Sequence, residues 1–358
     1  MKKSTLLTNL FTLLILSVTF ISCADDNDTE NTTTEEVSYN THLTNITDNV
    51  IVKTYADLAN KASVLHSEVQ DFSNNRTASN FDESKQAWRD ARAPWEKSEG
   101  FLFGPVDTDG VDPAIDSWPV NEVDLEAVLA SDDELTESYI ENSIDEIKGF
   151  HTIEYLLWGV DGNKQLEDFT DREFEYLIAV SENLKNRTAG LEEAWTASYA
   201  YNFKNAGTSS SDYISQKSAL ETLVTGLITI ADEVANGKIE DPLNGNAGSA
   251  DQTKEESRFS HNSKTDFANN MKSIANIYNG TYLTDGVGLA DIVNEYDAAL
   301  NTEFNTAVTN AIEAIENIPG TFTSAIENNR DAVTNAQEKV LTVFEILQSK
   351  IEPIIKNL

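Results

Sequence analysis

Residues 333–351 read VTNAQEKVLTVFEILQSKI, and their apolar side chains recur at every third or fourth position. An α-helix repeats about every 3.6 residues, so this spacing places them on one face of a helix. Residues 58–72, which read LANKASVLHSEVQDF, show the same pattern. Nowhere in the sequence do apolar and polar residues alternate over the length of a strand. The sequence therefore predicts an all-α fold.

Helices are expected along the whole chain after residue 40. The expected ranges are 41–73, 79–103, 121–130, 134–160, 170–204, 210–237, 264–279, 288–316 and 331–356. Helices of this length joined by short turns pack as antiparallel bundles. We expect two helical-bundle domains of the four-helix type, over residues 41–205 and 206–358, because the polar stretch 205–211 (NAGTSSS) separates them. Residues 104–119 and 236–263 are expected to form long loops.

The composition is strongly acidic and excludes several classes of partner. The chain has 358 residues, with 25 Lys and Arg against 61 Asp and Glu, which gives a formal net charge of −36. Binding to nucleic acid or to anionic lipid head groups requires a basic surface, so neither is expected. A hydrophobic content of 40% is too high for a wholly disordered acidic protein. The charged ligands that this chain favours are cations.

The first 40 residues predict export and a lipid anchor. Lys2 and Lys3 precede an apolar run, which is the pattern of a signal peptide over residues 1–22. Cys23 is the sole cysteine and directly follows this run, as in bacterial lipoprotein signals, so it is the expected lipidation site. The alternative is an ordinary signal peptide with an incidental cysteine. Residues 23–40 are expected to form an acidic tether.

This leader predicts a cell-envelope lipoprotein at the outer membrane, facing either the periplasm or the cell surface. The lipid on Cys23 would be its only attachment to the membrane. The acidic residues directly after Cys23 resemble a signal that exports some lipoproteins to the cell surface, and they are equally consistent with a plain acidic linker.

Residues 144–159, IDEIKGFHTIEYLLWG, carry the chemistry that stands out most. His151 and Glu154 are three residues apart, so both project from one face of a helix that is apolar on its other faces. Such a helix is buried, and its polar groups need partners. The pair is consistent with two metal ligands, with a carboxylate-oriented histidine, or with a hydrogen bond that only joins two helices. Gly149 would allow a backbone or a ligand to approach closely.

Several blocks of the sequence together resemble the imelysin family. GFHTIEYLLWG (149–159) resembles the GxHxxE motif of that family. Upstream, WRDARAPWEKSEGFLFGPVD (88–107) and DSWPVNEVDLE (116–126) resemble its Trp/Arg-rich helix, FGP loop and WP turn. Downstream, ESRFSHNSKTDFANNMKSIANIYNG (256–280) resembles its second-half block. The blocks stand in family order, and the resemblance covers about residues 40–355.

The resemblance implies a two-domain, all-helical protein of the periplasm or cell surface, with a functional cleft at the domain interface around the GxHxxE helix. The family includes iron-regulated proteins and an insulin-cleaving metallopeptidase, and it is similar to the periplasmic component of a ferrous-iron uptake system. Iron-uptake membrane proteins are therefore expected partners. A divalent metal, iron or zinc, is the expected cofactor or ligand.

His151, Glu154 and Glu99 are the residues predicted to bind the metal or ligand. Glu99 is chosen over Glu96 because Arg92 and Glu96 are spaced for an ion pair within one helix. Other residues of the matching blocks are expected to line the site: Gly149, Arg92, Asp107, Trp118, Glu256, Ser257, Arg258 and His261. Arg258 is expected to neutralise Glu154 or to hold an anion bound with the metal. The aspartates of residues 104–119 are expected to form a solvated loop; the alternative is that they hold a hard cation through their oxygens, although the EF-hand pattern is missing.

The favoured function is a lipoprotein that binds a metal ion or a small extracellular ligand, takes part in iron acquisition and is not an enzyme. A metallopeptidase is the first alternative, with Glu154 as a ligand or as the general base. A catalytic zinc has three protein ligands, and only two residues stand out here. The second alternative is the capture of an extracellular polysaccharide or peptide, with His151 and Glu154 as structural residues. No motif for a serine or cysteine nucleophile is present.

Overall fold

The computed structural model describes residues Ser38–Leu358. The predicted signal peptide, Cys23 and most of the acidic tether lie outside these residues. Within the described range the regular elements are all helices, and no strand is formed. The prediction of an all-α fold is confirmed. No helix in this range is both long enough and apolar enough to span a membrane.

The first half of the described chain contains ten α-helices, several of them short. They are α1 (Asn40–Asn45), α2 (Val52–Asn74), α3 (Ala78–Glu96), α4 (Pro105–Thr108), α5 (Val111–Asp116), α6 (Glu122–Leu129), α7 (Glu137–Glu141), α8 (Gly149–Trp158), α9 (Asp171–Ala194) and α10 (Ala200–Lys204). The π-helical turns η1 (Ile46–Ile51) and η5 (Trp195–Tyr199) join α1 to α2 and α9 to α10. A 3₁₀ turn, η2 (Glu99–Phe101), follows α3.

The second half contains eight more α-helices. They are α11 (Gln216–Glu233), α12 (Glu240–Asn244), α13 (Ser263–Asn279), α14 (Leu289–Tyr296), α15 (Ala298–Glu316), α16 (Phe322–Asn328), α17 (Arg330–Ile346) and α18 (Glu352–Lys356). The π-helical turns η6 (Val234–Ile239) and η8 (Leu347–Ile351) join α11 to α12 and α17 to α18. As predicted, one apolar face of α17 is buried, with Val333, Ala336 and Val340 fully covered.

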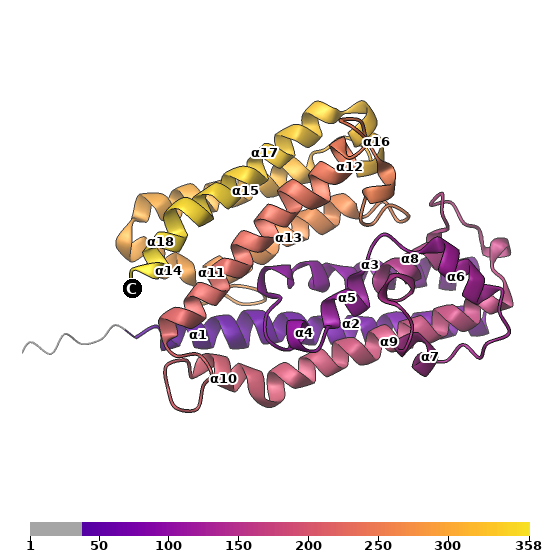
Figure 1. Cartoon of the computed structure of the whole chain (residues 1–358), viewed down its shortest axis with the longest axis horizontal. Coiled ribbons are helices and arrows are strands. Elements are labelled where there is room, and N and C mark those ends of the chain that lie inside the picture. The colour runs from indigo at the N-terminus through magenta and orange to yellow at the C-terminus, as the bar shows by residue number, and fades with distance from the viewer. Residues whose placement is uncertain (1–37) are drawn as a thin grey trace, which may run out of the picture. The chain divides into compact units, whose positions relative to one another are not determined.

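The long helices pack side by side in two groups. In the first half α2 packs against α3 and α9, and in the second half α15 packs against α13 and α17 (Figure 1). Contacts of α3 with α13 and of η2 with α11 join the two groups. Residues Ser38–Leu358 form one compact unit. The division into two domains at residues 205 and 206 stays a prediction.

The expected helix over residues 134–160 is wrong, because this segment forms α7, a 3₁₀ turn and α8. The break before α8 has a steric cause. Gly149 has a φ of +74°, which side-chain-bearing residues rarely adopt, and a Cβ there would collide with the carbonyl group of Ile115. α8 therefore starts at Gly149 and packs closely on the end of α5.

Other boundaries also differ from the expected ones. The predicted helix 288–316 is two helices, because Asp297 accepts hydrogen bonds from the backbone N–H groups of Ala299 and Leu300 and starts α15. The predicted loop 104–119 contains α4 and α5, and the predicted loop 236–263 contains most of η6 and all of α12. These short helices depend on tertiary contacts more than on a periodic sequence pattern.

Candidate functional site

Arg92 of α3 lies at the centre of a group of buried charges and is 0% exposed. Its guanidinium forms ion pairs with Asp116, with Glu96 at 2.5 Å and with Glu256 at 2.8 Å. Its Nε lies 3.8 Å from an oxygen of Asp266. The predicted ion pair between Arg92 and Glu96 is therefore present, within a larger assembly.

Lys238 is the second buried cation and comes from the π-helical turn η6. Its Nζ lies 2.8 Å from Glu99 Oε2 and 2.8 Å from Glu256 Oε1. It is also 3.8 Å from Glu96 Oε2. A lysine this deeply buried must be paired, and here three carboxylates surround it.

His151 and Glu154 form a hydrogen-bonded pair on α8. His151 Nδ1 lies 3.0 Å from Glu154 Oε2, while Glu154 Oε1 accepts two hydrogen bonds of 2.7 Å from the backbone N–H and the hydroxyl of Ser260. A carboxylate oxygen accepts hydrogen bonds, so Nδ1 carries a proton in this pair. Both oxygens of Glu154 are thereby used, and this residue fixes the orientation of the imidazole.

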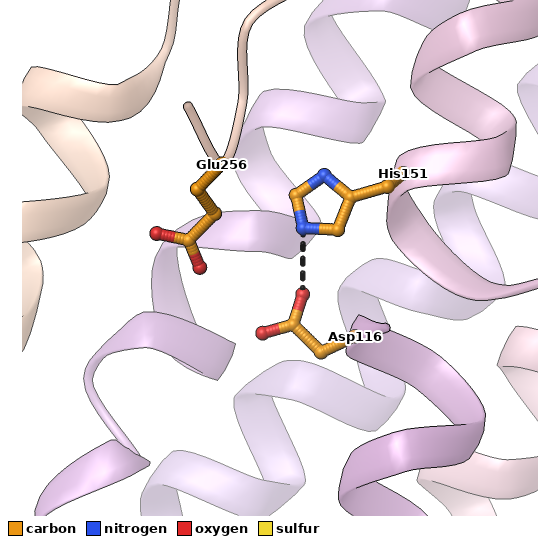
Figure 2. Close-up of side chains that lie close together, drawn as sticks. All are labelled: Asp116, His151 and Glu256. Carbon is orange, nitrogen blue, oxygen red and sulfur yellow. Dashed lines mark ion pairs between the residues drawn. The ribbon is translucent and has the colours of Figure 1, made fainter. Parts of the chain in front are cut away.

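The other imidazole nitrogen faces Asp116 at the end of α5. His151 Nε2 lies 3.1 Å from Asp116 Oδ1, and Trp95 Nε1 donates a 2.6 Å hydrogen bond to Asp116 Oδ2. Figure 2 shows the side chains of His151 and Asp116 close to that of Glu256, which comes from the segment before α13. Glycine at position 149 makes this meeting of α5 and α8 sterically feasible.

We call these residues the carboxylate cluster. It consists of Arg92, Lys238, His151, Glu96, Glu99, Asp116, Glu154, Glu256 and Asp266, none of which is more than 6% exposed. Six carboxylates surround two permanent cations. With the carboxylates ionised and the imidazole neutral, the cluster has four more negative than positive charges, an excess that Arg89, close to Glu154 and Asp266, offsets only in part.

The pKa values of the cluster reflect this excess. Burial raises the pKa of Glu96 and of Glu99 well above the usual range, although Lys238 opposes the rise. Burial also raises the pKa of Asp266 to about 7. Burial acts in the same direction on Asp116, but Arg92 and His151 outweigh it and hold the pKa of that carboxyl well below its usual range.

The pKa of the His151 imidazole is raised to about 9. Burial and Arg92 both disfavour its protonated form, but the contacts with Asp116 and Glu154 outweigh them. In the metal-free protein His151 is therefore an imidazolium near neutral pH.

Several buried polar atoms of the cluster have no hydrogen-bond partner among the described residues. They include Glu256 Oε2 and His151 Nε2, whose contact with Asp116 Oδ1 lacks hydrogen-bond geometry, and, beside the cluster, Asn270 Oδ1. Buried polar atoms are rarely left in this state, so each one requires an explanation. A bound cation would supply one for the oxygens and for the imidazole nitrogen.

Two sets of residues in the cluster have the spacing of metal ligands. The first is Asp116, His151 and Glu256, and the second is Glu96, Glu99, Asp116 and Glu256; in each set the donor atoms lie within 4.8 Å of one another. Imidazole and carboxylate donors suit iron, manganese and zinc. The donor types and the unpartnered atoms thus fit a divalent cation.

A pocket of about 240 Å³ reaches the cluster from the surface. Glu99 and Asp116 of the cluster line it, together with Asp112, Glu233 and Trp118. Burial and the nearby Asp116 raise the pKa of Asp112 to about 6. The pocket is therefore an acidic passage that ends at buried carboxylates.

The structure brings together most of the residues that the sequence nominates. Arg92, Glu99, His151, Glu154 and Glu256 all belong to the cluster. Nearby, Trp118 lies with its ring centroid 6.0 Å from that of His151, and Ser257 is buried. Gly149 has no side chain and thereby allows α8 to pack closely against the end of α5.

Three nominated residues lie away from the cluster. Asp107 is exposed on α4. His261 is exposed, with Nδ1 3.1 Å from the Thr323 hydroxyl. Arg258 does not neutralise Glu154, so this part of its expected role is wrong: its guanidinium pairs with Glu122, and Ser260 and His151 bind Glu154.

Four residues of the cluster or in contact with it were not predicted from the sequence. They are Asp116, which was expected in a solvated loop, and Lys238, Asp266 and Ser260. Two sequence patterns point to this region: the i,i+4 spacing of Arg92 and Glu96, and the i,i+4 spacing of Asp112 and Asp116. Neither pattern indicates that the residues are buried. Lys238 carries no local signal, because its position depends on the π-helical turn.

Known proteins resemble this chain over most of its length. A family model described as Imelysin matches residues 51–349. The chain is 28% identical over 337 residues to "Iron-regulated protein A" of Synechococcus elongatus, covering 90% of this chain and 88% of that protein.

Two solved structures are similar as well. One, from Parabacteroides distasonis, is assigned as an iron-regulated protein A precursor; it has a TM-score of 0.79 and 27% identity, covering 89% of this chain and 94% of the other. An imelysin-like protein from Psychrobacter arcticum 273-4 has a TM-score of 0.72 at 14% identity, covering 90% of this chain and 97% of the other, and shows the fold alone.

Proposed function

The chain belongs to the imelysin family, and from this premise we propose that it is a cell-envelope lipoprotein that binds a divalent metal ion and takes part in iron acquisition. One observation carries the proposal. His151 Nε2 and carboxylate oxygens of Asp116 and Glu256 converge within 4.8 Å, fully buried, in a cluster with an excess of carboxylates. Figure 2 shows this set.

In this proposal His151, Asp116 and Glu256 are the ligands, and Glu154 orients the imidazole. A metal-binding histidine commonly donates its second N–H to a carboxylate, which fixes the tautomer and the ring. The hydrogen bond from His151 Nδ1 to Glu154 has this arrangement, with Ser260 holding the carboxylate in turn. Glu99, predicted from the sequence as a ligand, contacts Lys238 instead and lines the pocket.

Metal binding must be coupled to the release of protons. His151 is an imidazolium at neutral pH, and a ligand nitrogen has to be deprotonated. A divalent ion would replace that proton and reduce the excess negative charge of the cluster. We regard iron as cargo, in line with the name of the Synechococcus relative, iron-regulated protein A, and membrane proteins of iron uptake as the partners.

No metallopeptidase activity is proposed. Glu154, the expected general base, binds the His151 imidazole and Ser260 instead, and it is not among the residues whose donor atoms converge as metal ligands. The donor set also contains one imidazole only, whereas zinc peptidases of the HExxH type use two.

Anaerobic calorimetry of the full chain with Fe²⁺ tests the metal-binding part. We expect saturable binding in the wild type and a loss of at least tenfold in affinity in His151→Asn. The matched control is His261→Asn, because His261 is exposed, outside the cluster, and has a positive φ that Asn tolerates. Equal affinities of the two variants would contradict the proposal.

Lipid attachment is tested separately by metabolic labelling with palmitate. The wild type should incorporate label, and Cys23→Ser should not, because the chain has no other cysteine. Equal labelling of both would contradict the lipoprotein assignment and leave the metal site unaffected.

A further inference from the structure

We propose that Glu96, Glu99, Asp116 and Glu256 form a second cation position, which the Lys238 ammonium fills and which a divalent cation occupies when it displaces that ammonium. This position shares Asp116 and Glu256 with the metal site proposed above, so the inference rests on the proposed function to that extent. Its own ligand class is a divalent cation bound through carboxylate oxygens.

The four carboxylates have the geometry of such a site. Their donor atoms lie within 4.8 Å of one another, and all four residues are buried. Lys238 Nζ contacts three of them, at 2.8, 2.8 and 3.8 Å. The ammonium therefore already lies where these carboxylates favour positive charge, which shows that the position attracts a cation.

One ammonium does not satisfy all the oxygens around it. Glu256 Oε2 has no hydrogen-bond partner although Glu256 is only 2% exposed. Asn270 donates from Nδ2 to Glu96 Oε2 and Glu99 Oε2, at 2.7 and 3.1 Å, yet its own Oδ1 is unpartnered and buried. Glu256 Oε2 is therefore an additional oxygen donor for a metal ion with six or more ligands, such as Mn²⁺.

The acidic pocket connects this position with the surface. Glu99 and Asp116 belong both to the four-carboxylate group and to the pocket wall. An incoming cation would meet Asp112 and Glu233 first and then Glu99 and Asp116, so carboxylates line its whole route to the cluster. The pocket thus reaches two of the four carboxylates, Glu99 and Asp116, without the unfolding of a helix.

The same pocket offers a place for the displaced ammonium. Lys238 Nζ lies 5.3 Å from the centroid of the Trp118 ring, which lines the pocket. An ammonium close to an indole face gains about 0.5–2 kcal/mol of cation–π attraction. A small movement of the lysine side chain would keep it near Trp118 while it vacates the carboxylates.

A tethered ammonium weakens metal binding, because the incoming ion must compete with a cation of very high local concentration. It also stabilises the metal-free cluster, in which an empty position would leave carboxylates unpaired. Lys238 therefore makes the second position one of moderate affinity, from which a metal ion can be released.

The test uses the full chain and Mn²⁺ alone, with binding measured by calorimetry and by electron paramagnetic resonance of free Mn²⁺. Lys238→Met removes the charge at nearly constant length. We expect Lys238→Met to bind one more Mn²⁺ per chain than the wild type, or to bind its weaker Mn²⁺ at least tenfold more tightly. Lys238→Arg keeps the charge and should behave like the wild type.

Lys148→Met is the matched control, because Lys148 is also buried but pairs with Asp145, outside the cluster. An unchanged stoichiometry and affinity in a folded Lys238→Met protein would overturn the inference. If His151→Asn loses one bound Mn²⁺ and Lys238→Met gains one, both positions are supported. If His151→Asn leaves Mn²⁺ binding unchanged while Lys238→Met strengthens it, the proposed function fails and this inference holds.

A measurement on the wild type decides the matter if Lys238→Met does not fold. Acetic anhydride modifies accessible amines, and mass spectrometry reports the extent at each lysine. Lys238 is 2% exposed, so it should react slowly without metal and at least several-fold faster with saturating Mn²⁺. Lys148 should show no such change. No increase at Lys238 would overturn the inference.

Discussion

His151 Nδ1 donates a 3.0 Å hydrogen bond to Glu154 Oε2, one turn further along the same buried helix. The second oxygen of Glu154 is held by Ser260, from a segment more than a hundred residues away in the sequence. This arrangement leaves the Nε2 atom of His151 directed toward Asp116 and Glu256. The geometry makes Glu154 the residue that selects the tautomer of the imidazole.

Glu154→Gln should therefore weaken metal binding by about 10–100-fold. The glutamine oxygen can still accept from Ser260, but its amide N–H₂ then faces His151 Nδ1 and favours the tautomer protonated at Nε2. That tautomer has no lone pair for a metal. Calorimetry with Fe²⁺ measures the loss, with Glu122→Gln as a control carboxylate outside the cluster. Unchanged affinity would show that Glu154 does not orient a ligand.

The stability of the metal-free protein should depend on the protonation of His151. Its pKa is raised from 6.5 to about 9 in the folded state, so its contribution is fully present below pH 6.5 and is lost as the pH rises through about 9. The full effect is on the order of 3 kcal/mol.

Urea unfolding of the wild type and of His151→Asn, in the presence of a chelator, measures this contribution. The difference in unfolding free energy between them should shrink from pH 6 to about pH 10. Comparing the two proteins at each pH removes the effect of the other titrating groups. A difference that stays constant over this range would rule out a protonated His151.

Gly149→Ala should destabilise the protein by more than about 1 kcal/mol. Alanine would have to adopt a φ of +74°, and its Cβ would push against the Ile115 carbonyl, next to Asp116. Gly190→Ala is the matched control, because Gly190 lies in the exposed part of α9 with open space around it. There alanine should stabilise the helix by about 0.5–1 kcal/mol. Thermal unfolding distinguishes the two, and equal shifts would contradict this explanation of the break before α8.

Arg92→Met should cost about 3–5 kcal/mol, because it leaves buried carboxylates without their counter-charge. Arg258→Met is expected to change stability by about 1 kcal/mol or less, since Arg258 and its partner Glu122 are both partly exposed. Chemical denaturation of the two variants compares a cluster arginine with a surface arginine. A similar, small effect of both would mean that the cluster carboxylates are protonated and do not need Arg92.

The sequence predicted the helical class and the long helices well, because their apolar periodicity is local information. It failed where tertiary contacts decide, as at Gly149, whose φ follows from the approach of Ile115. The family assignment, made from the motif blocks, is confirmed.

The candidate site was predicted only in part, for a related reason. His151 and Glu154 stand out because two polar residues on an apolar helix need partners. Asp116 and Lys238 do not stand out in the sequence, because nothing in their local sequence shows that α5 and the π-helical turn η6 meet at the buried cluster. The residue type alone does not distinguish a solvated aspartate from a buried one.

Anomalous X-ray diffraction at the iron absorption edge, from crystals of the full chain grown anaerobically with Fe²⁺, tests the central claim most directly. The proposed function predicts an anomalous peak within bonding distance of His151 Nε2 and of oxygens of Asp116 and Glu256. Iron bound at full occupancy only elsewhere in the crystal, with His151 Nε2 still in contact with Asp116, would contradict the proposed function.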